Sequence, residues 1–219
     1  MTNLPESISP LLTSADFGDR LRGISQLRQL EPAVAFDLIQ PLVEDKHPRV
    51  RYAAVSQMAT LGQQDPSQAL NLLRLRLQDS EPDVQAAAAD SLSALGLREI
   101  FDDLQKLYET TSEWLVKFSI LAALGSLGEP RGYELLADAL KSENEMLQTA
   151  AIGSLGELAD PRAVGLLTSF ISHPDWQIRF RVAQALGTIA TPETKPALQR
   201  LAQDAFEPVA QEAQRSLGG

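Results

Sequence analysis

Apolar residues recur along the chain with a period of about 31 residues. From Val50 to Gly62, the first, fifth, ninth and twelfth positions are apolar or alanine. Copies of this pattern start at intervals of 31, 34, 32, 31, 31 and 31 residues, so it is an internal repeat. The lead residues, which define position 0 of each copy, are Asp19, Val50, Val84, Val116, Leu147, Ile178 and Val209.

The spacing within each copy predicts helices. Apolar positions 0, +4, +8 and +11 form one stripe of an amphipathic helix. A second stripe lies outside that segment, for example in residues 135–140 and 164–171. Turn signals such as Asp160-Pro161 and Thr191-Pro192 separate the two stripes. Each repeat therefore predicts two antiparallel helices of about three turns, and Pro10 and Pro41 should bend the helices that contain them.

One such hairpin cannot bury both of its apolar stripes. Stacking several hairpins buries them in a continuous core, as in α-solenoids. No segment alternates between apolar and polar residues in the manner of a strand. The sequence therefore predicts an all-α fold, a right-handed α-solenoid of about seven helical hairpins.

Composition narrows the range of functions. The chain has no Cys and only two His, which excludes disulfides and thiolate metal sites and argues against a histidine zinc site. Its formal charge of −10 disfavours nucleic acid as a partner, because nucleic-acid binding needs a basic surface. We find no signal peptide and no apolar run long enough to span a membrane, so we expect a cytoplasmic protein without a required cofactor or metal.

The repeat also resembles a known family. The run Val-Arg-x-Ala-Ala, followed by Asp-Pro-Arg-Ala-Val-x-x-Leu, is similar to the HEAT-like repeat of the phycobilisome lyase type, most clearly in residues 116–136 and 147–167. The resemblance implies a single HEAT-like repeat domain over residues 1–219, with the Val-Arg helices lining a concave face. Within this group the chain is most similar to phycobilisome-degradation proteins of the NblB type, with bilin lyase subunits of the E/F kind as near relatives. The resemblance implies a phycobiliprotein as partner and an open-chain tetrapyrrole (bilin) as transient ligand.

Aromatic residues on the side of these helices opposite the core stripe are candidates for a groove. Positions −2 and +2 lie roughly opposite position 0, because a helix turns about 100° per residue. Small residues below them, such as Gly125 and Gly156, would form its floor. Two alternatives stay open: the position −2 rings pack on the neighbouring repeat, and the glycines only allow close helix contact. The candidate aromatic residues are Tyr52, Trp114, Phe118, Trp176 and Phe180.

Arginines near the lead positions are candidates for binding carboxylates of a bilin or a partner, because a guanidinium pairs with a carboxylate through two hydrogen bonds. At position +1, however, a structural contact with the turn of the adjacent repeat is the alternative. The candidate arginines are Arg49, Arg51, Arg179 and Arg181.

No nucleophile–base pair and no phosphate-binding loop can be assembled from the sequence. The function that we expect is therefore a non-catalytic or weakly catalytic binding protein that acts on phycobiliproteins, in phycobilisome degradation or pigment detachment. A bilin lyase-type subunit and a generic protein-interaction scaffold are the alternatives. A DNA-binding solenoid would need a basic face, which the charge of −10 disfavours.

Overall fold

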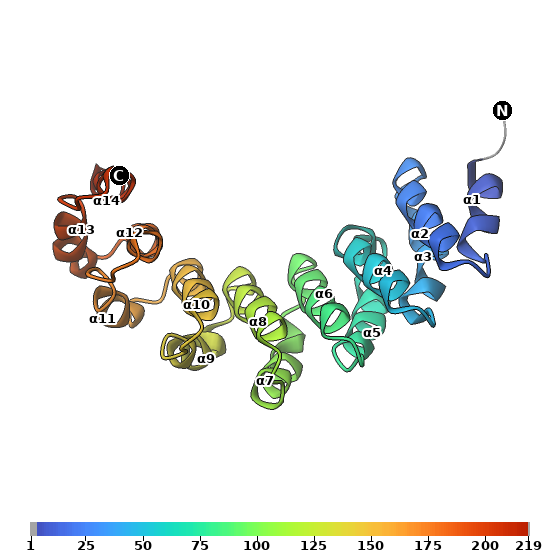
Figure 1. Cartoon of the computed structure of the whole chain (residues 1–219), viewed down its shortest axis with the longest axis horizontal. Coiled ribbons are helices and arrows are strands. Elements are labelled where there is room, and N and C mark those ends of the chain that lie inside the picture. The colour runs from blue at the N-terminus through green and yellow to red at the C-terminus, as the bar shows by residue number, and fades with distance from the viewer. Residues whose placement is uncertain (1–3, 219) are drawn as a thin grey trace. The chain divides into compact units, whose positions relative to one another are not determined.

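The computed structural model describes residues 4–218, and within them the regular elements are helices without any strand (Figure 1). The all-α prediction is confirmed. None of the described helices is both long enough and apolar enough to cross a bilayer. The α-helices are α1 Leu4–Leu12, α2 Phe17–Gln26, α3 Pro32–Ile39, α4 Pro48–Leu61, α5 Pro66–Arg76, α6 Pro82–Ala94, α7 Phe101–Thr110, α8 Trp114–Leu127, α9 Tyr133–Ala139, α10 Glu145–Leu158, α11 Ala163–Thr168, α12 Trp176–Ile189, α13 Lys195–Leu201 and α14 Glu207–Gly218.

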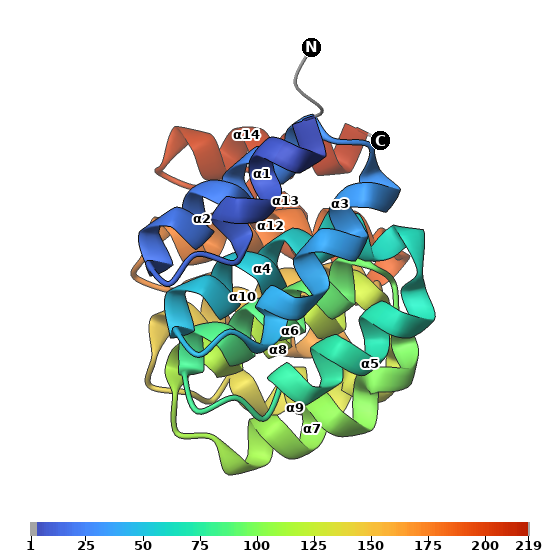
Figure 2. The same cartoon turned by 90° about the vertical axis from the view of Figure 1, so that its right-hand side faces the viewer.

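These helices form seven hairpins, each an odd-numbered helix followed by an even-numbered one. Every even-numbered helix carries one of the seven lead residues, which confirms the predicted repeat and the α-solenoid class. The chain contacts divide the molecule into two compact units that meet at Ile120 and Leu121, within α8. In the first unit α4 packs against α6, with α5 and α7 on one side of them (Figures 1 and 2). In the second unit α10 packs against α12, and α12 against α14.

The core of each unit consists of the predicted stripe. On α4, Val50, Ala54 and Met58 are completely buried. The corresponding positions on α12 are equally closed to solvent. Burying a side chain of this size removes apolar surface from water and stabilises the fold by about 1.5–3 kcal/mol. The stripes therefore hold neighbouring repeats together, because no hairpin could cover them alone.

The odd-numbered helices are shorter than predicted in the second unit. Helices α9 and α13 have seven residues and α11 has six, whereas α10 and α12 have fourteen. Pro130 and Pro192 start 3₁₀ turns, which use up the residues expected for a first α-helical turn. Pro10 lies inside α1 as predicted. Pro41 falls in a 3₁₀ segment that follows the end of α3 at Ile39, because proline has no N–H for the helix ladder.

In α6, α8, α10 and α12, position +12 follows the helix in a left-handed backbone conformation, whereas Gly62 after α4 stays right-handed. Gly96 and Gly128 take φ values of 70° and 58° there. The next two copies have alanine instead, and Ala159 and Ala190 are held at φ 52° and 50°. A Cβ in this region crowds the following carbonyl, which costs roughly 1–2 kcal/mol. The chain therefore stores strain at two alanines where its own repeat uses glycine.

We expect Ala159→Gly and Ala190→Gly each to raise the free energy of unfolding by about 1 kcal/mol, because glycine removes the Cβ crowding. Chemical denaturation measures the change. Ala150→Gly, in the middle of α10, is the matched control and should destabilise by about 1 kcal/mol. A loss of stability in Ala159→Gly and Ala190→Gly would show that the left-handed backbone is not strained at these alanines.

Candidate partner-binding surface

The even-numbered helices carry large apolar side chains that solvent reaches. Tyr52 on α4, Trp114 on α8 and Met146 on α10 are 48%, 49% and 51% exposed. These residues stand within one turn of their lead positions but off the buried stripe. Exposed aromatic and thioether side chains of this size are typical of surfaces that bind proteins. Tyr52 lines a hollow in the first unit, and Met146 lines another in the second unit.

The first hollow, the α4–α6 pocket, has a volume of about 720 Å³ and lies within the first unit. Its walls come from α4 and α6 and from the start of α8. Tyr52 and Arg49, both predicted site residues, line it together. Its apolar lining is otherwise mostly small side chains, which leave the space open: Ala59, Ala86, Ala87 and Ala94.

One carboxylate of this pocket, that of Asp90, has a shifted pKa. Asp90 lies near the middle of α6 and lines the α4–α6 pocket. Its Oδ2 accepts a hydrogen bond of 3.2 Å from Ser119 Oγ of α8. Asp90 is exposed to solvent as a residue, and the pocket walls remove only part of the hydration of its carboxyl. This desolvation raises the pKa of the Asp90 carboxyl above its usual range, against the lowering effect of Ser119.

The second hollow, the α10–α12 pocket, has a volume of about 500 Å³ in the second unit. It brings together three predicted site residues, Trp176, Phe180 and Arg181. The exposed Met146 adds to its apolar wall, and Glu145 is one of its acidic residues. The pocket thus combines two aromatic rings with one guanidinium and two carboxylates, those of Glu145 and Asp175.

Of the candidate rings at position −2, Trp176 also packs on the next repeat, which is one of the alternatives that the sequence left open. Trp176 stacks on Phe206, at position −3 of the following copy, with ring centroids 4.7 Å apart. Phe17 stacks in the same register on His47 at 4.0 Å. His47 also caps α4, since its Nδ1 accepts the Arg49 backbone N–H at 3.2 Å. Trp176 therefore has a structural contact in addition to its place in the pocket wall.

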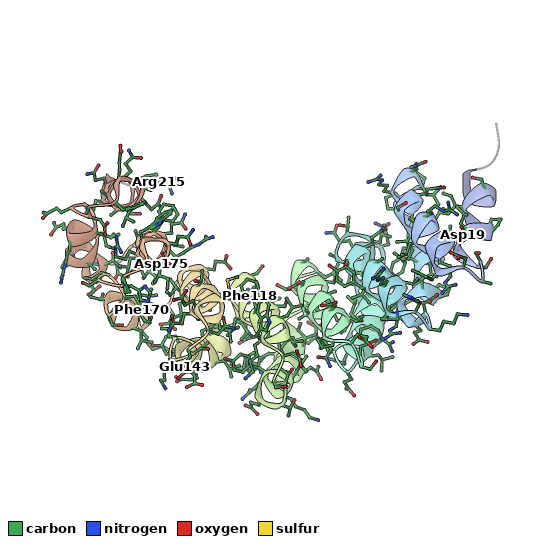
Figure 3. The ribbon with its side chains drawn as sticks, in the orientation of Figure 1. Asp19, Phe118, Glu143, Phe170, Asp175 and Arg215 are labelled. Carbon is green, nitrogen blue, oxygen red and sulfur yellow. The ribbon has the colours of Figure 1, made fainter. Side chains whose placement is uncertain are left out.

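Phe118 is half-buried and lies on the side of α8 turned away from α7 (Figure 3). Its neighbours in sequence, Leu115 and Ser119, line the α4–α6 pocket. The five predicted aromatic residues are thus divided between the two units. Tyr52, Trp114 and Phe118 belong to the first and Trp176 and Phe180 to the second.

The glycines at position +9 form a helix contact. A Cβ on Gly125 would lie 2.7 Å from Ser154 Cα, and one on Gly156 would lie 2.7 Å from Ala185 Cα. Both glycines are buried. They let consecutive even-numbered helices approach closely, and the expectation that they form the floor of a groove does not describe them.

Two of the predicted arginines are engaged in contacts between repeats. Arg51 donates to Asp79 from Nε at 2.8 Å and from Nη2 at 2.7 Å. Arg179 donates to Asp204 in the same way, at 2.6 and 2.9 Å. In each pair the Arg stands at position +1 and the Asp at position −5 of the next repeat. These guanidinium groups hold repeats together, which was the structural alternative for position +1.

The same pairing recurs at fixed positions of the repeat. Arg20, the third arginine at position +1, donates to Asp45 at 2.9 Å, again at position −5 of the next copy. The other copies with Gln or Lys at position +1 are followed by Thr111, Ser142 or His173 at that place. Arginine and its aspartate thus occur together or not at all, which was a signal available in the sequence.

The remaining two arginines face solvent. Arg49 is exposed at the α4–α6 pocket. Arg181 is exposed at the α10–α12 pocket, where its Nη1 donates to Gln184 at 3.3 Å. Of the four predicted arginines, these two are therefore the ones placed to meet a partner or ligand.

The Arg179–Asp204 pair should make stability depend on pH. Hydrogen bonding from Arg179 lowers the pKa of Asp204, against a smaller desolvation effect. The folded pKa then lies below the unfolded value of about 3.9, so the pair stabilises above that pH and the contribution is lost as the pH falls through the folded pKa. We expect Asp204→Asn to lose less stability than the parent between pH 5 and pH 3 in parallel denaturation series. An unchanged pH profile would contradict this.

The two tryptophans should differ in fluorescence. Trp114 is half exposed, whereas Trp176 is stacked on Phe206 and more covered. We expect Trp176→Phe, which leaves Trp114 as the only indole, to emit at longer wavelength and to be quenched more strongly by acrylamide than Trp114→Phe. Equal emission and quenching would place the two indoles in equivalent surroundings and contradict the difference.

Three residues of this surface escaped the sequence-based prediction. Asp90 is the only acidic residue at position +6, where the other copies have Ser, Ala, Gly, Gln or Arg. Alignment of the repeats could have singled it out. Ser119 and Met146 carry no such signal, since small polar and apolar residues are common on helices of this kind.

Comparisons with known proteins agree with this architecture. The family model described as HEAT repeats matches residues 70–151 and 133–218. The search of curated proteins gave no match. Among solved structures, the complex of CpcE and CpcF of phycocyanin lyase from Nostoc sp. PCC7120 has a TM-score of 0.65 and 22% identity, over 98% of this chain and 93% of that one. YibA of Escherichia coli has a TM-score of 0.74 and 16% identity, over 100% of this chain and 82% of that one.

An engineered protein is similar as well, with a TM-score of 0.64 and 20% identity, over 99% of this chain and 68% of that one. At these identities, the likeness to solved structures extends to the fold. The match to the family model covers most of the chain and includes both units. Together with seven hairpins of regular register, it shows that the chain belongs to the family of proteins built from HEAT repeats.

Proposed function

We propose that this protein is a cytoplasmic, non-catalytic or weakly catalytic HEAT-repeat scaffold that binds phycobiliproteins through its even-numbered helices. The observation that carries the proposal is the exposure of Tyr52, Trp114 and Met146, of which Tyr52 and Met146 each line a pocket. Exposed aromatic anchors such as Tyr52 and Trp114 supply much of the free energy of protein binding. Repeat proteins typically bind partners along such surfaces.

The choice of partner rests on the resemblance of the repeat to the phycobilisome lyase type and, within it, to degradation proteins of the NblB type. The fold shared with the CpcE–CpcF complex of phycocyanin lyase supports trying this class of partner first. The α10–α12 pocket is the proposed place for a loosely held open-chain tetrapyrrole. Trp176 and Phe180 offer flat apolar contact there, and Arg181 offers a cation for a propionate.

The test is binding of the purified protein to purified phycocyanin, measured by tryptophan quenching and by pull-down. We expect a complex with a dissociation constant in the micromolar range. Trp114→Ala and Tyr52→Ala should each weaken it by about 1–3 kcal/mol while leaving the thermal melt nearly unchanged. The matched control is Leu75→Ala, because Leu75 is equally exposed but lies on the odd-numbered helix α5.

Absorbance followed during the same experiment separates the rival functions. A stable pigment spectrum with binding supports the scaffold. Loss or transfer of the pigment absorbance supports the lyase-type alternative, in which the chain presents or removes the bilin. Absence of binding to phycobiliproteins at tens of micromolar, or equal weakening by the Leu75 control, would overturn the proposal and leave a scaffold for other proteins.

A further inference from the structure

The α4–α6 pocket is negatively charged, and its charges lie at two levels. The outer level lies at the start of α4 and α6, at positions −3 to −1, and holds Arg49, Glu81 and Asp83. Position +6 forms the inner level, where Asp90 is the only formally charged residue. Seven residues of helix separate the levels, or about 10 Å. No ion pair joins Arg49 to Asp90 within residues 4–218, and the pocket as a whole carries more negative than positive charge.

Asp90 differs from the turn aspartates of this protein. Asp45, Asp79 and Asp204 each receive an arginine of the preceding repeat. Within residues 4–218, Asp90 has a hydroxyl donor, Ser119, and no ion pair. Its carboxylate has lost hydration to the pocket walls, which is why its pKa is raised. A cation that entered the pocket would meet a carboxylate with unused acceptor capacity.

An aromatic ring lines the same pocket as this carboxylate. Tyr52 stands one helical turn before the inner level, on α4, which packs against the α6 helix of Asp90. A guanidinium over a ring of this type is attracted by its π-electrons. The protein uses the same contact elsewhere: Arg162 Cζ lies 4.0 Å from the Tyr133 ring centroid.

We propose that the α4–α6 pocket binds an arginine side chain of a protein partner, with the guanidinium paired to Asp90 and its flat face against Tyr52. Charge complementarity selects the cation, and the planar fork of arginine matches a carboxylate with free acceptor positions. The volume of about 720 Å³ exceeds one side chain and accommodates apolar neighbours of the arginine on the alanine lining. The inference rests on the proposed function in one respect, that the ligand of this surface is a protein.

The same charges disfavour an open-chain tetrapyrrole at this place. Such a ligand carries two carboxylates, and Glu81, Asp83 and Asp90 outnumber the single guanidinium of Arg49. Like charges close together in a partly desolvated pocket repel each other. The pigment is therefore an alternative occupant that the experiment must separate from arginine.

The experiment titrates the isotope-labelled full chain with N-acetyl-arginine N-methylamide and follows backbone amide signals by NMR at fixed ionic strength. N-acetyl-citrulline N-methylamide is the matched probe, with the same shape and no charge. We expect millimolar binding of the arginine probe, with shifts centred on Tyr52, Asp90 and Ser119, and binding at least about tenfold weaker for citrulline. Equal shifts with both probes would overturn the proposal. So would the absence of any shift near Asp90 at a probe concentration of about 50 mM.

Variants locate the site. Asp90→Asn should weaken the arginine probe about tenfold, and Tyr52→Leu about threefold to tenfold. Asp83→Asn is the control for net charge, because it removes one carboxylate from the outer level of the same pocket, and it should change binding less than threefold. Circular dichroism checks that each variant is folded. Equal loss in both aspartate variants would replace the specific pair with a general charge effect and overturn the proposal.

The two proposals fail separately. Arginine binding that depends on Asp90, without binding to phycocyanin, keeps the pocket and rejects the partner. Phycocyanin binding that is unchanged in Asp90→Asn keeps the partner and rejects the pocket as its arginine site. Biliverdin is the third probe: binding that disappears in Asp90→Asn, without binding of the arginine probe, assigns the pocket to pigment and overturns the inference.

Discussion

Leu155→Ala is expected to lower the free energy of unfolding by about 2–5 kcal/mol. Leu155 stands at position +8 of α10 and is completely buried. Truncation removes three carbons' worth of burial and leaves a cavity that α10 and α12 cannot close, since Gly156 already brings their backbones into contact. Urea denaturation followed by circular dichroism measures the change.

The matched control for Leu155 is Leu166→Ala on α11. Leu166 belongs to the same unit but is 36% exposed, so its truncation should cost less than about 1 kcal/mol. Similar losses for the two variants would contradict the assignment of position +8 to the core. The equivalent Leu92, Leu124 and Leu186 are also completely buried, and their truncation should repeat the result.

The repeat pattern predicted the helices well because the positions that must be buried between neighbouring helices have to be apolar in every copy. Every lead residue lies in an even-numbered helix, and the buried stripe falls on the predicted positions. The lengths of α9, α11 and α13 were less accessible, because a proline after a turn is compatible with both an α-helical and a 3₁₀ first turn. The left-handed residues Ala159 and Ala190 were hidden as well, since alanine at a helix end does not signal a positive φ.

The candidate surface was predicted in part. Side-chain direction on a helix follows from its angle, which placed Tyr52 and Trp114 on the exposed side. The partners of a side chain depend on the neighbouring repeat, which one helix cannot reveal. Trp176 meets Phe206, and the Arg51 guanidinium is taken by Asp79. Asp90 stands out only when the copies are compared at position +6.

The ion pairs between repeats connect sequence to stability most directly. Asp79 accepts from Arg51 through both carboxylate oxygens and from the Glu81 backbone N–H at 3.1 Å. Its side chain is 3% exposed and that of Arg51 is 12%. Arg51 Nη1 also donates to the carbonyl of Asp45 at 3.0 Å, so the guanidinium is fixed in place from two sides. Such a pair cannot rearrange toward water when one partner is lost.

We therefore expect Asp79→Ala to lower the free energy of unfolding by about 3–5 kcal/mol, because it leaves the Arg51 charge nearly buried and unpaired. Asp103→Ala is the matched control, since the Arg74–Asp103 pair is 38% and 37% exposed and its loss should cost at most about 1 kcal/mol. Adding Arg51→Met to Asp79→Ala removes the more deeply buried of the two arginines that pair with Asp79, the other being Arg76 at 3.4 Å, so the double variant should be more stable than Asp79→Ala alone. Urea denaturation of the parent, Asp79→Ala, Arg51→Met and the double variant gives the coupling between the two residues, and strictly additive losses would show that the pair does not join the repeats.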